Sequence, residues 1–175
     1  MNYQLSEQKE IWNMSELIVF AFPNETGASE MDEAINQLKK EELIVLDDAA
    51  TVVRKPDGKI KVKQATNLVG AGVLGGAFWG MLIGLFFWMP WLGLAVGAVA
   101  GAITSKLYDY GINDDFIKEV GETIKPGGSA LFLLISKWTE DKALEKLNKF
   151  NATIVRTSLS KEDELKLKAA FGAGE

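Results

Sequence analysis

A long stretch without charge most limits what this chain can fold into. From Gln64 to Ser105 no side chain is charged, and Pro90 interrupts the stretch near its middle. Glycines recur at every fourth position on both sides of this proline: Gly72, Gly76, Gly80 and Gly84 before it, and Gly93, Gly97 and Gly101 after it. This spacing places each series on nearly one face of a helix, where two helix backbones can pack closely. We therefore predict a membrane helical hairpin over residues 66–107, with these glycines as its helix-packing residues.

The two arms of this hairpin fit a bilayer unequally. Leu68 to Met89 would form a helix about 33 Å long and Trp91 to Leu107 one of about 25 Å, against a hydrocarbon core of roughly 30 Å. The tip, which holds Pro90 and two tryptophans, either reaches the far interface or stops inside the bilayer as a re-entrant loop. Several large apolar side chains of the first arm favour insertion into lipid, among them Leu82, Ile83, Phe86 and Phe87.

The alternative to a membrane hairpin is a hairpin buried in a soluble protein. We disfavour it because so many glycines would cost such helices about 1 kcal/mol each. The rest of the chain also offers little material to wrap two arms of this size.

The flanks of the stretch are basic, although the chain has a net charge of −5. Arg54 and Lys55 come first on the N-terminal side, followed by three lysines of an alternating pattern. This bias predicts that both halves of the soluble domain face the cytoplasm at the cell inner membrane. The predicted membrane-interface residues are Trp88, Trp91, Lys59, Lys61, Lys63 and Lys106. Contact with anionic lipid headgroups, worth about 1 kcal/mol per residue, is one interpretation of the lysines, and a solvated strand face is the other.

Two βαβ patterns flank the hairpin. The apolar runs Leu17–Phe22 and Leu131–Ser136 are typical of strands covered on both faces, and each leads into an amphipathic helix and a second strand. Two such halves predict an α+β fold, a ferredoxin-like βαβ-βαβ sandwich with an inserted two-helix transmembrane or re-entrant glycine-zipper hairpin. The predicted divisions are an N-terminal extension (1–13), the first half of the domain (14–65), the hairpin (66–107), a connecting helix (108–128), the second half (129–159) and a C-terminal helix and tail (160–175).

The residue types needed for catalysis are scarce. The chain has no cysteine and no histidine, which removes the usual ligands of zinc, iron and copper and leaves no cysteine nucleophile and no histidine general base. Adjacent carboxylates such as Asp47-Asp48 usually point apart, and no phosphate-binding loop is present. We therefore predict no catalytic residue, no cofactor and no metal site, and the negative net charge argues against nucleic acid as a partner.

Several landmarks together resemble a prokaryotic family of uncharacterised membrane proteins, a domain of unknown function. They are the opening Ser15–Phe22, the strand around Val45–Ala50, the glycine hairpin and the segment Pro126–Leu131. The similarity covers about residues 14–171. It implies association with a membrane and supplies no activity or catalytic residue.

Three functions follow as hypotheses. The first is a non-enzymatic membrane protein that self-assembles through its hairpin and its α/β domain into a structural or scaffolding homo-oligomer. The second is a channel or pore built from packed hairpins, although the stretch holds no ionisable residue to line an ion path. The third is a membrane-anchored regulator that senses a small ligand, a hypothesis based on analogy of fold.

Overall fold

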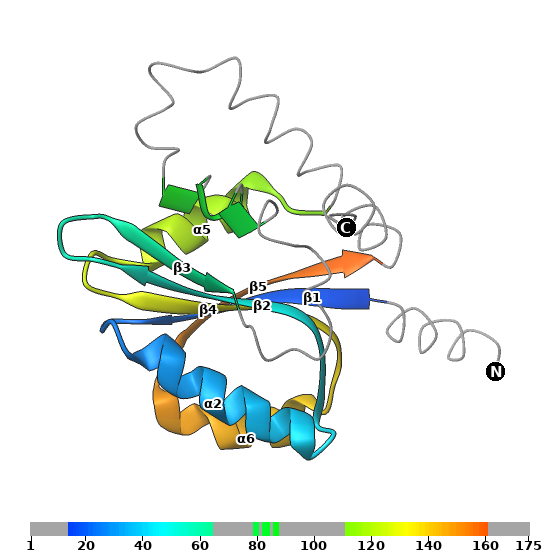
Figure 1. Ribbon diagram of the computed structural model, residues 1–175. Coiled ribbons are helices and arrows are strands. Elements are labelled where there is room, and N and C mark those ends of the chain that lie inside the picture. Colours follow the sequence, from blue (N-terminus) through cyan, green and yellow to red (C-terminus); the bar gives the residue numbers. More distant parts are fainter. Residues whose placement is uncertain (1–13, 65–78, 81, 85, 88–110, 161–175) are drawn as a thin grey trace.

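Strands and helices follow one another along the chain in an α+β arrangement (Figure 1). The computed structural model describes residues 14–64, 79–80, 82–84, 86–87 and 111–160. Its elements are β1 (Met14–Phe22), α2 (Gly27–Lys40), β2 (Ile44–Arg54), β3 (Ile60–Gln64), α5 (Asp114–Thr123), β4 (Ser129–Trp138), α6 (Glu140–Leu147), the 3-10 helix η1 (Asn148–Phe150) and β5 (Thr153–Ser160).

The strands form one antiparallel, five-stranded sheet in the order β3-β2-β4-β1-β5. The two apolar runs pair with each other as the central strands, and Val19 of β1 lies opposite Phe132 of β4. A strand in this position buries side chains on both of its faces, which explains why these runs lack a polar alternation. The neighbours Ile18 and Val19 point to opposite faces, and both are 0% exposed.

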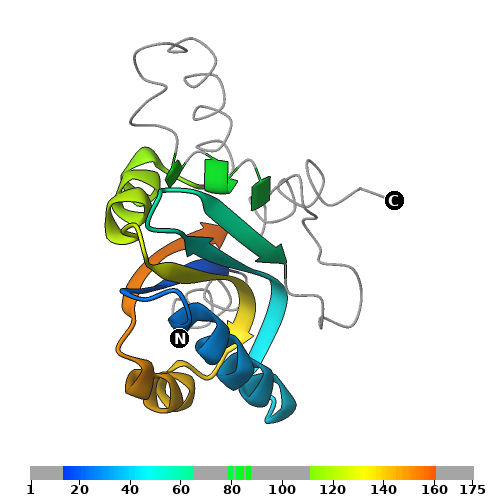
Figure 2. The same cartoon turned by 60° about the vertical axis from the view of Figure 1, so that its left-hand side comes forward.

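α2 and α6 cover one face of the sheet (Figure 2). α2 contributes Met31, Ile35 and Leu38, whose spacing of four and three places them on one side of the helix. The start of α2 packs so closely on β1 that a Cβ added at Gly27 would lie 2.5 Å from the ring of Phe22. This contact requires glycine at the first position of the helix.

β2 and β3 form a hairpin whose turn has the sequence Lys-Pro-Asp-Gly. Gly58 has a φ of 85°, a left-handed conformation that favours glycine, and its N–H donates to the carbonyl oxygen of Lys55 at 2.9 Å. The Asp57 carboxylate accepts from the N–H of Lys59 at 3.0 Å. These two hydrogen bonds close the turn.

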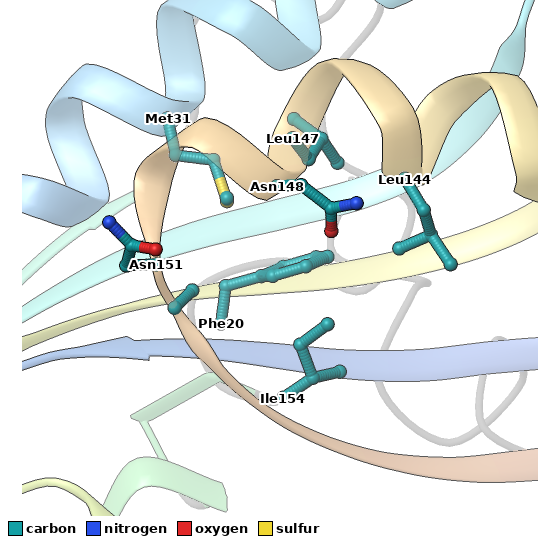
Figure 3. A pocket seen from close by; sticks show the side chains of 8 residues that line it. Phe20, Met31, Leu144, Leu147, Asn148, Asn151 and Ile154 are labelled. Atoms are coloured by element: carbon teal, nitrogen blue, oxygen red, sulfur yellow. The ribbon is translucent and has the colours of Figure 1, made fainter.

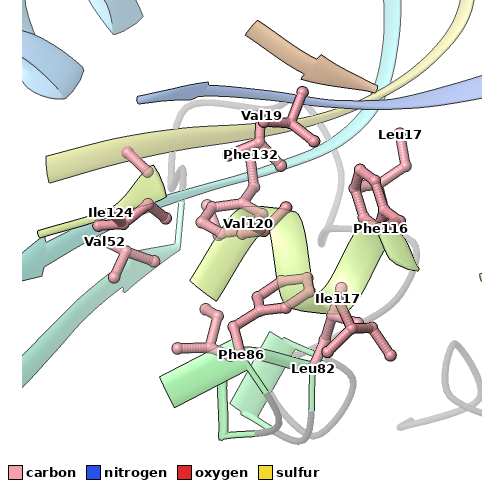
Figure 4. Close-up of a cluster of buried hydrophobic side chains, with 14 of the residues drawn as sticks. Leu17, Val19, Val52, Leu82, Phe86, Phe116, Ile117, Val120, Ile124 and Phe132 are labelled. Atoms are coloured by element: carbon pink, nitrogen blue, oxygen red, sulfur yellow. The ribbon is translucent and has the colours of Figure 1, made fainter. Parts of the chain in front are cut away.

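The second face of the sheet is covered by α5 together with helical residues between 79 and 87 (Figures 1 and 4). α5 begins after Asn113, whose side-chain oxygen accepts from the N–H of Phe116 at 2.8 Å. It contributes Phe116, Ile117 and Val120 to the buried cluster on this face. The sheet is therefore enclosed between two apolar layers.

The predicted strands and helices that fall within the described residues are present, with ends that shift by up to a few positions. β5, for example, continues to Ser160, one residue beyond the predicted end of the second half at 159. Thr139 stands at the N-cap of α6, but its side chain makes no capping hydrogen bond. The predicted extension 1–13 and the predicted helix after Ser160 lie outside the described residues.

Candidate functional site

One segment of the charge-free stretch lies against the sheet and defines the candidate site (Figure 4). It consists of Trp79, Leu82, Ile83, Phe86 and Phe87, which we call the docked segment. Their spacing of three and four forms one stripe along a helix, and their exposed fractions range from 0% to 8%. Their sequence pattern favours lipid, whereas in the structure these side chains pack against the α/β domain.

Aromatic contacts hold the docked segment to the sheet. The Phe86 ring stacks on Phe132 of β4, with centroids 5.4 Å apart and planes at 19°. It also meets the Phe116 ring of α5 edge-on at 6.0 Å. At the other end of the docked segment, the Trp79 ring also contacts the Phe132 ring, edge-on with centroids 6.0 Å apart. Each such pair contributes about 0.5–1.5 kcal/mol beyond the burial of its surface.

The docked segment also approaches the backbone of α5. A Cβ added at Gly121 would lie 2.4 Å from the carbonyl oxygen of Phe86, a distance that no side chain permits. Glycine thus lets the two helical pieces touch, as expected for small residues between helices. This packing role of Gly121 was not among the predictions from the sequence. The feature that could have indicated it is the position of this glycine inside an amphipathic helix, where a glycine usually has a packing reason.

Arg54 joins the docked segment to the end of α5. Its Nη1 donates to the carbonyl oxygen of Ile124 at 2.7 Å, and its guanidinium carbon lies 5.2 Å from the centroid of the Phe87 ring. The backbone of Arg54 exchanges hydrogen bonds with the Gly127-Gly128 turn at 2.7 and 2.9 Å. In the sequence Arg54 is one of the basic charges that flank the uncharged stretch; in the structure its side chain has a partly buried bridging position.

Two of the predicted helix-packing glycines fall within the described residues. Gly80 is exposed and Gly84 is half-buried. Among the described residues, nothing lies within 4 Å of a Cβ placed at either glycine. Both therefore lie away from the stripe that contacts the sheet, and their packing role stays a prediction. The other glycines of the two series (72, 76, 93, 97 and 101), together with Trp88, Trp91 and Lys106, lie outside the described residues.

The three lysines at the β3 edge are exposed. Lys61 and Lys63 stand opposite Val53 and Thr51 of β2, whereas Val62 stands opposite Val52, which belongs to the cluster under the docked segment. Lys61 and Lys63 therefore point to the α2 side of the sheet. Lys59 lies 3.3 Å from the carboxylate of Asp57. This arrangement agrees with a solvated strand face, and contact with headgroups stays a prediction.

A cavity of about 250 Å³ lies on the other face of the sheet, between α6, η1 and β5 (Figure 3). Phe20 and Met31 are buried within its lining, and Ile154 is 44% exposed at the sheet edge. Its lining carries no charged side chain: Phe20, Met31, Leu144, Leu147, Asn148, Asn151, Ala152 and Ile154. Such a lining, apolar side chains with two asparagines, suits a small uncharged molecule.

Several charged side chains of the described residues form ion pairs. Arg156 lies 2.7 Å from Glu140 and 3.8 Å from Glu16. Burial raises the pKa of Glu16 above its ordinary value, and the positive charge of Arg156 partly opposes this effect. Within the described ranges, no group of three or more carboxylates could hold a metal ion. Asp47 and Asp48 make separate contacts, since Asp47 accepts from the Ser136 hydroxyl and Asp48 from the N–H of Ala49.

In the described parts of the chain, no helix combines the length and the apolar composition needed to cross a bilayer. Most of the predicted hairpin, including all of residues 88–107, lies outside those parts.

Comparison with known proteins yields one family. No curated protein and no solved structure matches the chain. The model of a family described as "Protein of unknown function (DUF1269)" matches residues 73–172, a range that includes the docked segment, α5, β4, α6 and β5. The opening strand and the Val45–Ala50 strand, which we used for the resemblance, precede this range. Because the match covers more than half of the 175 residues, the chain belongs to the DUF1269 family.

Proposed function

We propose that this protein is a non-enzymatic membrane protein that self-assembles as a structural or scaffolding oligomer. In this proposal the uncharged residues around the docked segment enter the bilayer, and the docked segment joins them to the α/β domain. The domain lies on the cytoplasmic side of the inner membrane.

The observation that carries the proposal is that the segment containing the second arm of the predicted hairpin joins the domain on one face of the sheet at both of its ends. Residues 88–110 leave the described structure at Phe87 and return to it at Gly111. Phe87 is 8% exposed and the neighbouring Ile112 is 0% exposed, and both belong to the same buried cluster on the α5 face. Both ends of this segment, which is uncharged as far as Ser105, are therefore fixed to one side of the domain, as a hairpin that enters and leaves a bilayer on one side requires.

The opposite side of the domain suits water. The outward residues of α2 and α6 include exposed charges such as Glu33, Lys40 and Lys142. A membrane on the α5 side would leave this charged layer in the cytoplasm, in agreement with the basic flank that the positive-inside rule uses.

We also propose that the domain is ferredoxin-like. Without the edge strand β3, the order of the sheet is β2-β4-β1-β5, and two βαβ halves contribute alternate strands to it. α2 and α6, one from each half, share a face. Both features are those of the ferredoxin-like sandwich. β3, the charge-free stretch and α5 then form an insertion between the halves.

The test is flotation of the full chain with lipid vesicles. We expect the protein to float with vesicles and to resist extraction by alkaline carbonate, since hairpin insertion does not depend on charge. Vesicles with added anionic lipid measure any contribution of Lys59, Lys61 and Lys63. A protein that stays at the bottom of the gradient with both kinds of vesicle would overturn the membrane proposal.

Self-assembly is tested with Gly80→Leu. Because a Cβ at Gly80 meets no described atom, leucine there should leave the domain folded and the protein in the membrane fraction. We expect a smaller or heterogeneous oligomer on a sizing column in mild detergent, because leucine separates helices that pack through glycine. An unchanged oligomer would show that the glycine face does not hold the subunits together.

The cavity supports a second candidate function, a regulator that binds a small uncharged ligand. Its test is a thermal-shift screen of uncharged metabolites against the full chain, with Ala152→Trp as the variant that fills the cavity. A shift that persists in this variant would place the ligand elsewhere.

A further inference from the structure

The two edges of the sheet differ in how well they are protected from pairing with another strand. β3 has 5 residues, and its exposed lysines are a common means of blocking an edge. β5 has 8 residues, contains neither lysine nor proline, and pairs with β1 along its whole length without a register shift. Among the described residues, nothing pairs with the outer edge of β5.

The single charge in β5 offers little protection. Arg156 lies within 2.7 Å of Glu140 and 3.8 Å of Glu16, so its charge is balanced by two carboxylates of the same chain. Ile154 is 44% exposed on the same face of the strand, beside the cavity formed with α6 and η1 (Figure 3). β5 therefore combines a regular open edge with an exposed apolar side chain.

We propose that β5 pairs antiparallel with β5 of a second copy of this chain, joining the two sheets across a two-fold axis at Thr157. The identity of the partner rests on the self-assembly proposed above. An axis perpendicular to the joined sheet keeps each face of both copies on the same side, and directly opposite residues then have their side chains on the same face. Because side chains alternate along a strand, two such residues are an even number of positions apart. The axis therefore passes through one residue rather than between two.

The register follows from the length and the side chains of β5, because the longest pairings of this strand have their axis at one of its two central residues, Arg156 or Thr157. An axis at Arg156 would place two arginines opposite each other, which is unfavourable. An axis at Thr157 pairs threonine with threonine and Arg156 with Ser158. It also pairs Val155 with Leu159, which both belong to the apolar cluster on the α5 face. This register leaves no like charges directly opposite.

The same symmetry agrees with a membrane on one side of the assembly. A two-fold axis perpendicular to the sheet keeps the α5 faces of both copies on the same side. Both docked segments, and the uncharged residues that continue from them, would then point toward a single bilayer. Pairing through the lysine-rich β3 edge would give the same symmetry but would bring two sets of lysines together.

Cysteine cross-linking of the full chain in mild detergent tests the register. The chain has no native cysteine, so each introduced thiol is unique. Under mild oxidation, Thr157→Cys should form a covalent dimer, because its Cα would lie about 4.5–5.5 Å from its own copy. Ser158→Cys, one residue away, is the matched control and should cross-link much less. Equal cross-linking at both positions, or none at either, would overturn the proposal.

A second pair of variants tests the edge without introducing a thiol. Ile154→Lys and Val62→Lys change side chains that are both 44% exposed and lie near opposite edges of the sheet. We expect Ile154→Lys to weaken dimerisation about tenfold or more in sedimentation experiments, and Val62→Lys to leave it unchanged. Loss of the dimer with Val62→Lys alone would assign the interface to β3.

These results are separable from those of the proposed function. Cross-linking at Thr157 in detergent does not require insertion into vesicles, and flotation does not require β5 pairing. A protein that floats but fails to cross-link would refute the β5 interface alone.

Discussion

Arg54 illustrates how one side chain connects parts of the chain that are distant in sequence. It holds the carbonyl oxygen of Ile124, which lies 70 positions away, and places its guanidinium over Phe87. Arginine suits this position because its planar group can stack on a ring while its N–H groups donate sideways. The cationic group therefore stabilises the junction between the docked segment, α5 and β2.

Replacement of Arg54 should destabilise this junction. Arg54→Ala removes the hydrogen bond to Ile124 and the contact with Phe87, and we expect the free energy of unfolding to fall by about 1–3 kcal/mol. Arg54→Lys should recover only part of the loss. Urea denaturation measures both, with Lys61→Ala as a control at an exposed position of the other hairpin strand. Equal stability of Arg54→Ala and the control would contradict the bridging role.

Glu16 makes stability depend on pH. Burial raises the pKa of its carboxyl, so the folded state holds this proton more tightly than the unfolded state. The contribution to stability is fully present below the ordinary pKa of glutamate, about 4.3, and is lost as pH rises through the raised folded-state pKa. The side chain of Glu16→Gln cannot ionise, so this variant does not lose stability in this way as pH rises. We therefore expect the difference in free energy of unfolding, variant minus wild type, to increase from pH 4 to pH 7.

Denaturant titrations at several pH values measure this difference, and Glu145→Gln, at an exposed position of α6, controls for loss of a carboxylate. The loss of the ion pair with Arg156 acts in the opposite direction, but at 3.8 Å and partial exposure it should be the smaller effect. A pH dependence identical to wild type would show that Glu16 is not the group responsible.

At the scale of the elements, glycines in two neighbouring helical segments have opposite environments. Gly121 meets the carbonyl oxygen of Phe86, whereas Gly84 has open space around its Cβ position among the described residues. In an unobstructed helix, alanine is more favourable than glycine by about 1 kcal/mol. The same substitution should therefore have opposite effects at these two positions.

We expect Gly84→Ala to be neutral or stabilising, and Gly121→Ala to lower the free energy of unfolding because the new methyl group separates α5 from the docked segment. Thermal or urea unfolding of both variants provides the comparison, and each variant serves as the control for the other. Two variants that are equally stabilised would indicate that the docked segment does not rest on α5 in solution.

The strands and helices could be predicted from sequence because apolar runs and amphipathic spacing report local burial. β1 and β4 are predictable as central strands, since both of their faces are apolar. The location of the docked segment was not predictable in this way. An apolar stripe such as Leu82, Ile83 and Phe86 can pack against lipid tails or against the face of a sheet. Helical periodicity therefore cannot distinguish between these two environments. Contacts such as Arg54 with Ile124 depend on the tertiary arrangement and leave no local pattern.

At the scale of the whole molecule, the family assignment and the fold describe overlapping parts of the chain. The DUF1269 match runs from residue 73 to 172. The sheet also needs β1, β2 and β3, which precede the match, because β4 pairs with both β1 and β2. The matched range therefore contains the docked segment, α5 and the second half of the domain. A fragment limited to this range would lack three of the sheet's strands.

The order of the strands in the sheet also determines when the sheet can form during synthesis of the chain. Both neighbours of β1 are strands that the ribosome makes after the charge-free stretch, and Phe86 stacks on Phe132 of one of them. At roughly 5–20 residues per second, the chain between Phe86 and the end of β5 takes about 4–15 s to synthesise. During that interval the aromatic residues of the docked segment have no sheet to bind. The uncharged stretch of the nascent chain therefore leaves the ribosome before the completed sheet can cover the docked segment.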